Sequence, residues 1–150
     1  MCGIFAFLNR KFLSKYKINN ILKSLDCLKH RGPDDTRYII KNYNFLGFHR
    51  LSINGLDKGS NQPIIYKNLS LICNGEIYNY KELALNHNIN LTTNSDCEII
   101  PKLFELYGIE KTVNLLDGVF AFILYDEDKD ITYAARDPVG VRPLFYTFDD

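Results

Sequence analysis

The sequence has no tryptophan, no net formal charge and no apolar run long enough to cross a membrane. Its longest apolar run, residues 119–125, is far shorter than the roughly 20 residues that a transmembrane helix needs. No N-terminal stretch combines a basic region, a long apolar run and a cleavage site, so no signal peptide is predicted. A neutral chain is not drawn to nucleic acid or to anionic lipid. These absences predict a soluble, cytoplasmic protein without nucleic-acid or membrane partners.

The spacing of the cysteines argues against a metal site. The four cysteines are Cys2, Cys27, Cys73 and Cys97, with none in C-x-x-C spacing and only His30 near one of them. We therefore expect no zinc site and no other bound metal. In the cytoplasm the thiols stay reduced. A chain of 150 residues with 46% apolar residues suits one domain that buries its core without disulfides.

The first half of the chain shows strand and helix patterns in alternation. Residues 3–8 (GIFAFL) predict a buried strand, and apolar residues at helical spacing predict a helix that ends near Lys29. The pair Gly32-Pro33 predicts a loop. Residues 45–48 and 69–73 predict two short strands, and Asn74-Gly75 after the second is typical of a turn.

The second half predicts one helix with an unusual proline. Ser95 and Glu98 have the spacing of a capping box, so we expect a helix to begin at Ser95 and to stop at Gly108. Pro101 fits such a helix poorly, because it would remove a hydrogen bond and kink the second turn.

Strand patterns follow this helix. Residues 119–125 and 131–135 predict a hairpin, and residues 144–148 predict a last strand. Strands interleaved with helices predict a layered α/β or α+β domain, which by itself implies no function.

Cys2 is the first candidate for chemistry. Methionine aminopeptidase removes Met1 when the second residue is small, so the mature chain would begin with Cys2 and its free α-amine. An α-amine has a pKa of roughly 7.7–8.0, close to the value of about 8.5 for a thiol. Such an amine is a workable base beside its own thiol, and this arrangement needs no histidine. A buried strand from Gly3 onwards would hold both groups rigidly. Alone, a cysteine at this position is also compatible with no function.

Three further features suit an amide-hydrolysing site. The side chain of Asn74 and the backbone N–H of Gly75 are donors that an oxyanion requires, although Asn-Gly is also an ordinary turn. Arg50 and Asp96 offer opposite charges to an amino-acid zwitterion. Arg50 is equally compatible with a surface role, and Asp96 with the start of a helix. For His30 and His49 we expect structural roles.

Together these residues resemble a known family. The start MCGI resembles class II glutamine amidotransferases, which are N-terminal-nucleophile hydrolases. Within that group, the sequence is most similar to the glutaminase domain of glutamine-hydrolysing asparagine synthetases. The segments that carry the resemblance, in family order, are HRGPD (30–34), GFHRLSI (47–53), QP (62–63), NGEIYNY (74–80), SDCE (95–98), LDGVFAF (116–122) and RDPVGVRPLFY (136–146).

The resemblance implies a fold and a set of roles. The expected fold is α+β, a four-layer αββα sandwich. Cys2 corresponds to the nucleophile, Asn74 and Gly75 to the oxyanion hole, and Arg50 to the residue that binds the α-carboxylate of glutamine. The substrate-binding residues that the resemblance implies are Arg50, Leu51, Ser52, Ile53, Asn54, Asn74, Gly75, Glu76 and Asp96. The implied reaction is hydrolysis of L-glutamine to glutamate and ammonia through a γ-glutamyl thioester, with the ammonia used for asparagine synthesis.

The resemblance also sets limits on this chain. Residues 1–150 correspond to the glutaminase domain, which in the family continues some tens of residues past Tyr146, so we expect this one to be C-terminally incomplete. The family's ATP-binding synthetase domain is absent. We therefore expect no cofactor here, with ATP and Mg²⁺ in a synthetase domain that acts in cis or in trans. Three alternatives stay open: a sister class II amidotransferase, a non-catalytic glutamine-sensing module, and a fragment without activity.

Overall fold

The computed structural model describes residues 2–8, 15–52 and 61–148, with residues 15 and 16 described by their backbone alone. Within these residues, no helix is both long and apolar enough to span a membrane. Short 3₁₀ helices cover Lys29–Arg31 and Asp96–Glu98. The longer elements are β1 (Gly3–Phe7), α1 (Lys15–Asp26), β2 (Asp35–Lys41), β3 (Asn44–Arg50), β4 (Ile64–Tyr66), β5 (Leu69–Ile77), α2 (Tyr80–Asn86), α3 (Ile99–Leu115), β6 (Gly118–Asp126) and β7 (Ile131–Arg136).

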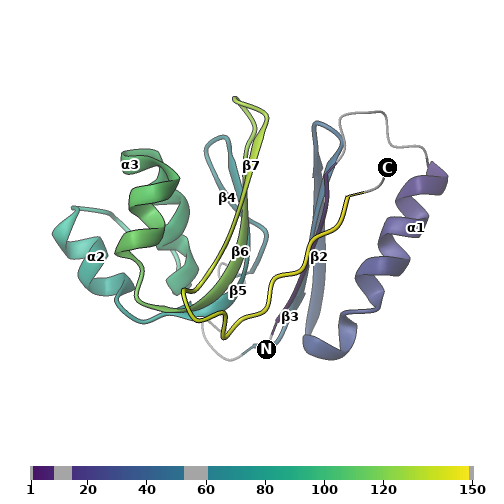
Figure 1. Ribbon diagram of the computed structural model, residues 1–150, viewed down its shortest axis with the longest axis horizontal. Helices are drawn as coiled ribbons and strands as arrows, with labels where there is room; N and C mark the ends of the chain where they lie inside the picture. The colour runs from purple at the N-terminus through teal and green to yellow at the C-terminus, as the bar shows by residue number, and fades with distance from the viewer. Residues whose placement is uncertain (1, 9–14, 53–60, 149–150) are drawn as a thin grey trace.

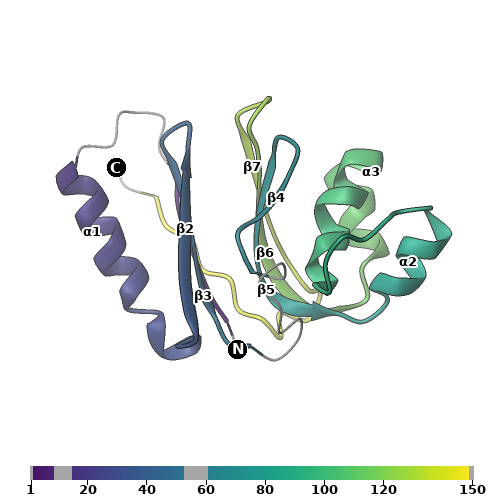
Figure 2. The same ribbon diagram turned by 180° about the vertical axis from the view of Figure 1, so that it is seen from behind.

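Two antiparallel sheets lie face to face between helices (Figure 1). One sheet has the order β1-β3-β2 and the other the order β4-β5-β6-β7. Helix α1 covers the outer face of the first sheet, and α2 and α3 cover the outer face of the second, as the reverse view in Figure 2 also shows. The predicted α+β class is confirmed, and this arrangement is consistent with a sandwich of the N-terminal-nucleophile hydrolase type.

Apolar side chains fill each space between these layers. Strand β3 contributes side chains to two of these spaces. Phe45 packs on α1, whereas Leu46 and Phe48 point toward the second sheet. Successive strand residues point to opposite faces, so a strand between two layers must be apolar on both. Between the two sheets, the buried cluster consists of Leu46, Phe48, Ile72 and Tyr125.

Strand prediction failed in two opposite ways: strands β2 and β4 were missed, and one predicted strand does not form. Strand β2 was missed because it is an edge strand whose side chains, such as Tyr38 and Ile40, are largely exposed and give no alternating pattern. Residues 144–148 form no strand, although their composition favours one. Their aromatic side chains Phe145 and Tyr146 are exposed, and β7 remains the edge of its sheet. A strand requires a hydrogen-bonded partner as well as suitable side chains.

The long helix begins later than its sequence pattern predicts. Asp96–Glu98 form a 3₁₀ turn, Ser95 makes no side-chain cap, and α3 starts at Ile99. Pro101 then falls in the first turn, where backbone N–H groups have no partner within the helix, so the expected kink is absent there. Gly108, with φ 76° and ψ 177°, does interrupt the helix, but helical structure resumes and continues to Leu115.

The Glu98 carboxylate organises this turn instead of capping a helix. It accepts hydrogen bonds from the backbone N–H and hydroxyl groups of Thr92 and Thr93, at 2.7–3.1 Å. Lys102 Nζ lies 2.7 Å from Glu98 Oε1, and both side chains are buried. Burial alone would raise the pKa of Glu98, but the Lys102 ion pair and the threonine donors outweigh it and lower the pKa to about 2.

Glu98→Gln is therefore expected to destabilise the protein in a pH-dependent way. A lowered pKa stabilises the fold above the unfolded-state value of about 4.3, and this contribution is lost as the pH falls toward 2. We expect a loss of roughly 2–4 kcal/mol at pH 7 that vanishes near pH 2, measured by urea unfolding. Glu105→Gln, which breaks an exposed pair with Lys67, is the control and should cost less than about 1 kcal/mol. Equal losses for the two variants would contradict this account.

Candidate active site

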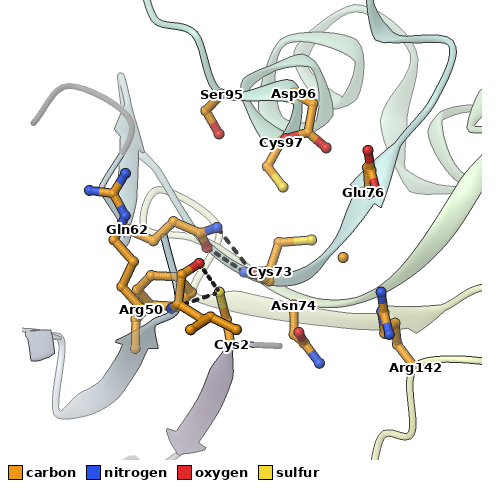
Figure 3. A pocket seen from close by; sticks show the side chains of 13 residues that line it. Cys2, Arg50, Gln62, Cys73, Asn74, Glu76, Ser95, Asp96, Cys97 and Arg142 are labelled. Atoms are coloured by element: carbon orange, nitrogen blue, oxygen red, sulfur yellow. Dashed lines mark hydrogen bonds between the residues drawn. The ribbon is translucent and has the colours of Figure 1, made fainter. Parts of the chain in front are cut away.

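A pocket of about 100 Å³ lies beside Cys2, next to the first residue of β1. Its walls come from the end of β3, the middle of β5 and the 3₁₀ turn at Asp96–Glu98 (Figure 3). The residues that line it are Cys2, Phe48, Arg50, Leu51, Gln62, Cys73, Asn74, Gly75, Glu76, Ser95, Asp96, Cys97 and Arg142.

The Cys2 thiol is held by the backbone of one residue. Leu51 N donates to Cys2 Sγ at 3.4 Å, and Cys2 Sγ lies 3.7 Å from Leu51 O. Arg31 Nε also donates to the Cys2 carbonyl oxygen at 3.4 Å. Burial raises the pKa of the Cys2 thiol, and the contact with the Leu51 backbone lowers it only in part. The thiol therefore needs a base to become a nucleophile near neutral pH.

Two separated sequence motifs meet to place Leu51. The loop after the first 3₁₀ turn packs tightly on the end of β3, because a Cβ added at Gly32 would lie 2.3 Å from the His49 carbonyl oxygen. Two residues later, Asp34 Oδ2 accepts a hydrogen bond from Ser52 N at 2.7 Å. The HRGPD segment thus fixes the chain on both sides of Leu51, and a glycine is required where the two backbones touch.

Arg50 lies at the pocket wall within a chain of polar contacts. Its side chain is buried, and Nη1 donates to Asn61 Oδ1. Asn61 Nδ2 donates in turn to Asp35 Oδ2 at 3.1 Å, and Arg37 Nε lies 2.9 Å from the same carboxylate oxygen. These contacts orient the guanidinium, whose planar fork suits a carboxylate.

Asn74 and Gly75 lie inside β5 and not in a turn, which corrects the prediction from the Asn-Gly pair. They pair with Ala121 and Phe120 of β6, and β5 continues to Ile77. Gly75 is needed here because an added Cβ would lie 2.4 Å from Val119 O. Close backbone approach, and not a turn, explains this glycine.

Asp96 faces the pocket from the opposite wall. Its Oδ2 accepts a hydrogen bond from Ile77 N at 2.6 Å. Burial raises the pKa of Asp96, and the Ile77 N–H lowers it only in part. Figure 3 shows Glu76 and Asp96 on the same side of the pocket, and Glu76 is exposed. The pocket thus has carboxylates on one side and Arg50 on another.

Most of the predicted site residues converge on this pocket. Ser52 lies next to the wall without lining it, and Ile53 and Asn54 lie outside the described residues. Neither His30 nor His49 lines the pocket, and His49 bonds to backbone and hydroxyl groups as expected of a structural residue. The predicted residues that do line the pocket are Cys2, Arg50, Leu51, Asn74, Gly75, Glu76 and Asp96.

The thiols and two polar side chains add to this picture. Cys73 and Cys97 are buried in the pocket wall, whereas Cys27, one residue past the end of α1, is exposed. Gln62 and Arg142 line the pocket and were not predicted. Both belong to segments that carried the family resemblance, and membership of those segments was the sequence feature that could have indicated them.

The fold and pocket define an α+β protein with a cysteine held at the start of its first strand. A family model described as a glutamine amidotransferase domain matches residues 1–150. The chain is 42% identical to a probable glutamine-hydrolyzing asparagine synthetase of Acanthamoeba polyphaga mimivirus, covering 99% of this chain and 28% of that protein. A glutamine-hydrolyzing asparagine synthetase of Bacillus subtilis is 39% identical, and the match covers 98% of this chain and 20% of that protein. The asparagine synthetase of Rattus norvegicus is 42% identical, and the match covers 97% of this chain and 26% of that protein.

The chain belongs to the glutamine amidotransferase domain family. It spans between 20% and 32% of the length of the curated relatives that it matches.

Proposed function

We propose that this chain hydrolyses L-glutamine to glutamate and ammonia, with Cys2 as the nucleophile. The observation that carries the proposal is the position of the Cys2 thiol, held by Leu51 in a pocket that also contains Arg50 and Asp96. Those two side chains have the charges that the α-carboxylate and α-ammonium groups of an amino acid require. The names of the matched relatives, which are glutamine-hydrolyzing asparagine synthetases, support the same substrate.

The reaction proceeds in two steps. After removal of Met1, the α-amine of Cys2 takes the thiol proton, and the sulfur attacks the γ-carbonyl carbon of glutamine. Asn74 and the Gly75 N–H donate to the oxyanion that forms. The C–N bond then breaks, the amine returns the proton to the departing ammonia, and a γ-glutamyl thioester remains. Water hydrolyses the thioester, releasing glutamate and regenerating the thiol.

The ammonia serves a second reaction in another domain. We propose that a synthetase domain, linked in cis or acting in trans, uses it to make asparagine from aspartate with ATP and Mg²⁺. No step in the glutaminase reaction requires a cofactor, because proton transfer and nucleophilic attack are both performed by Cys2. We place the reaction in the cytoplasm, where the thiol stays reduced.

Cys2→Ala is expected to abolish glutaminase activity. So is any N-terminal extension that keeps Met1 attached, because the thiol and the base belong to the same residue. The measurement is glutamate release from glutamine, with intact-mass determination of the first residue. Cys27→Ala, at the exposed cysteine, is the matched control and should be fully active. Normal turnover by a protein that retains Met1 would exclude the α-amine as the base, and it would favour a different mechanism.

Asn74→Ala is expected to lower turnover far more than it weakens binding. A donor aimed at the oxyanion acts in the transition state, so kcat should fall about 10²–10³-fold while KM changes little. Steady-state kinetics with glutamine measure both quantities. An unchanged kcat with a raised KM would instead place Asn74 in ground-state binding.

Arg50→Ala and Asp96→Ala are expected to weaken glutamine binding in different ways. Each removes a charge-assisted contact worth roughly 1.5–3 kcal/mol, which corresponds to about a 10- to 100-fold rise in KM. Arg50→Ala should lose discrimination against glutamine α-amide, which lacks the carboxylate. Asp96→Ala should lose discrimination against N-acetylglutamine, which lacks the ammonium. Normal kinetics with a lowered melting temperature for Asp96→Ala would make Asp96 a structural residue of the turn.

A further inference from the structure

Gln62 completes the ladder between β4 and β5 with its side chain. The backbone register pairs Ile64 with Leu71, so residue 62 falls opposite Cys73. At that position the side-chain amide makes both ladder bonds: Gln62 Nε2 donates to Cys73 O at 3.0 Å, and Gln62 Oε1 accepts from Cys73 N at 2.5 Å (Figure 3). The side chain is buried, at 6% exposed. A primary amide has one donor and one acceptor side, and it can therefore replace a peptide group.

The same edge of β5 is bonded by a side chain two rungs further on. In a β-strand, the N–H and C=O of alternate residues point to the same edge. Cys73 and Ile77 both point to the β4 edge, since they bond to Gln62 and Asp96 respectively. Gly75 lies midway between them, and its N–H therefore points to this edge as well. Both flanking side chains line the pocket, and so does Gly75.

This arrangement leaves the Gly75 N–H uncovered by β4 in the part of the chain that the structure describes. Strand β4 pairs with β5 as far as Leu71, and Gln62 adds one rung at Cys73. A backbone strand that continued in the same register would next bond to Gly75 and occupy its N–H. A side chain supplies a single rung and then ends. Among the described residues, the ladder therefore ends at Cys73, one rung before Gly75, whose N–H stabilises the oxyanion in the proposed reaction.

We propose that Gln62 is a positioning residue for glutamine hydrolysis: by ending the β4–β5 ladder at Cys73, it fixes the Gly75 N–H toward the reacting carbonyl. This inference rests on the proposed glutaminase function. Gln62 acts through the backbone of β5 and not on the substrate. Asp96 holds the other side of the same short segment through Ile77 N, so Gly75 is fixed between two buried side-chain contacts.

Two substitutions remove the rung in different ways. Gln62→Met keeps the length of the side chain and removes both hydrogen bonds. Gln62→Glu keeps the oxygen that accepts from Cys73 N but replaces the donor with a second acceptor facing Cys73 O. The matched control is Asn68→Leu, just before the opposite end of β5, which breaks the bond from Asn68 Nδ2 to Asp126 Oδ1 at 3.0 Å. That control should be destabilised without any change in kinetics.

The readout must separate oxyanion stabilisation from general binding. A misplaced donor should lower kcat about 10- to 100-fold in both Gln62 variants, with KM changed by less than about twofold. L-Glutamate γ-semialdehyde adds reversibly to a thiol and gives a tetrahedral adduct with an oxyanion. Its inhibition constant should rise by the same factor as kcat falls. The product glutamate forms no oxyanion, so its inhibition constant should stay the same.

Each result then decides a different claim. If the unsubstituted chain releases no glutamate from glutamine, the proposed function fails and this inference fails with it. If that chain is active and both Gln62 variants match its kcat, only the positioning role is wrong. Equal weakening of the aldehyde and of glutamate would make Gln62 a purely structural residue. Should Gln62→Met fail to fold, as judged by thermal melting, Gln62→Glu carries the test by the same two inhibition constants.

Discussion

The packing of the two sheets against each other is the constraint on which the site depends. Leu46 and Phe48 of β3 pack with Ile72 of β5 in one buried cluster. The next residues along these strands are those of the pocket: β3 leads to Arg50 and Leu51, and β5 leads to Asn74. Dense packing leaves little freedom to slide one sheet over the other. The distance between the Cys2 thiol and β5 is therefore fixed by apolar contacts made a few residues away.

Around the pocket, side chains take the place of backbone partners. Gln62 bonds to the backbone of Cys73, and Asp96 accepts the N–H of Ile77. The buried Asp137 carboxylate similarly accepts N–H groups of Val141 and Arg142, at 2.9 and 3.0 Å. Regular structure would have satisfied these groups too, but it would have covered the strand edge and closed the pocket. Buried polar groups need hydrogen-bond partners. Here side chains supply those partners and leave space for a substrate.

The sequence predicted the elements whose patterns are local, and missed what depends on distant neighbours. Residues 119–125 form a continuous apolar run that an acidic segment separates from residues 131–135, and their hairpin is confirmed as β6 and β7. The Asn74-Gly75 pair was wrongly predicted to form a turn, because Asn-Gly is typical of turns. Gly75 is instead required because the backbone of β6 lies close to it. Glu98 was assigned to a helix cap by spacing alone, and its partners are threonines earlier in the chain. These partners, together with Lys102, are near in sequence, but the capping-box spacing of Ser95 and Glu98 does not distinguish them from a helix cap.

The residues of the candidate site also divide into those that the sequence predicted and those that depend on the fold. Resemblance placed Cys2, Arg50 and Asp96 in one site, and the pocket brings all three together. Gln62 could not be assigned a role, because its function as a ladder rung depends on the register between β4 and β5. Register is set by cross-strand packing and is not visible in one segment.

Burial has the same effect on two groups that the proposed reaction needs in their charged forms. It raises the pKa values of both the Cys2 thiol and the Asp96 carboxyl. A dry pocket disfavours an isolated charge but strengthens the attraction between opposite charges. The ammonium group of glutamine would therefore favour ionised Asp96 as it binds, and the α-amine of Cys2 would gain its proton as the thiol loses one. In the proposed reaction, the charges that the substrate and the chain terminus bring thus offset the effect of desolvation on both groups.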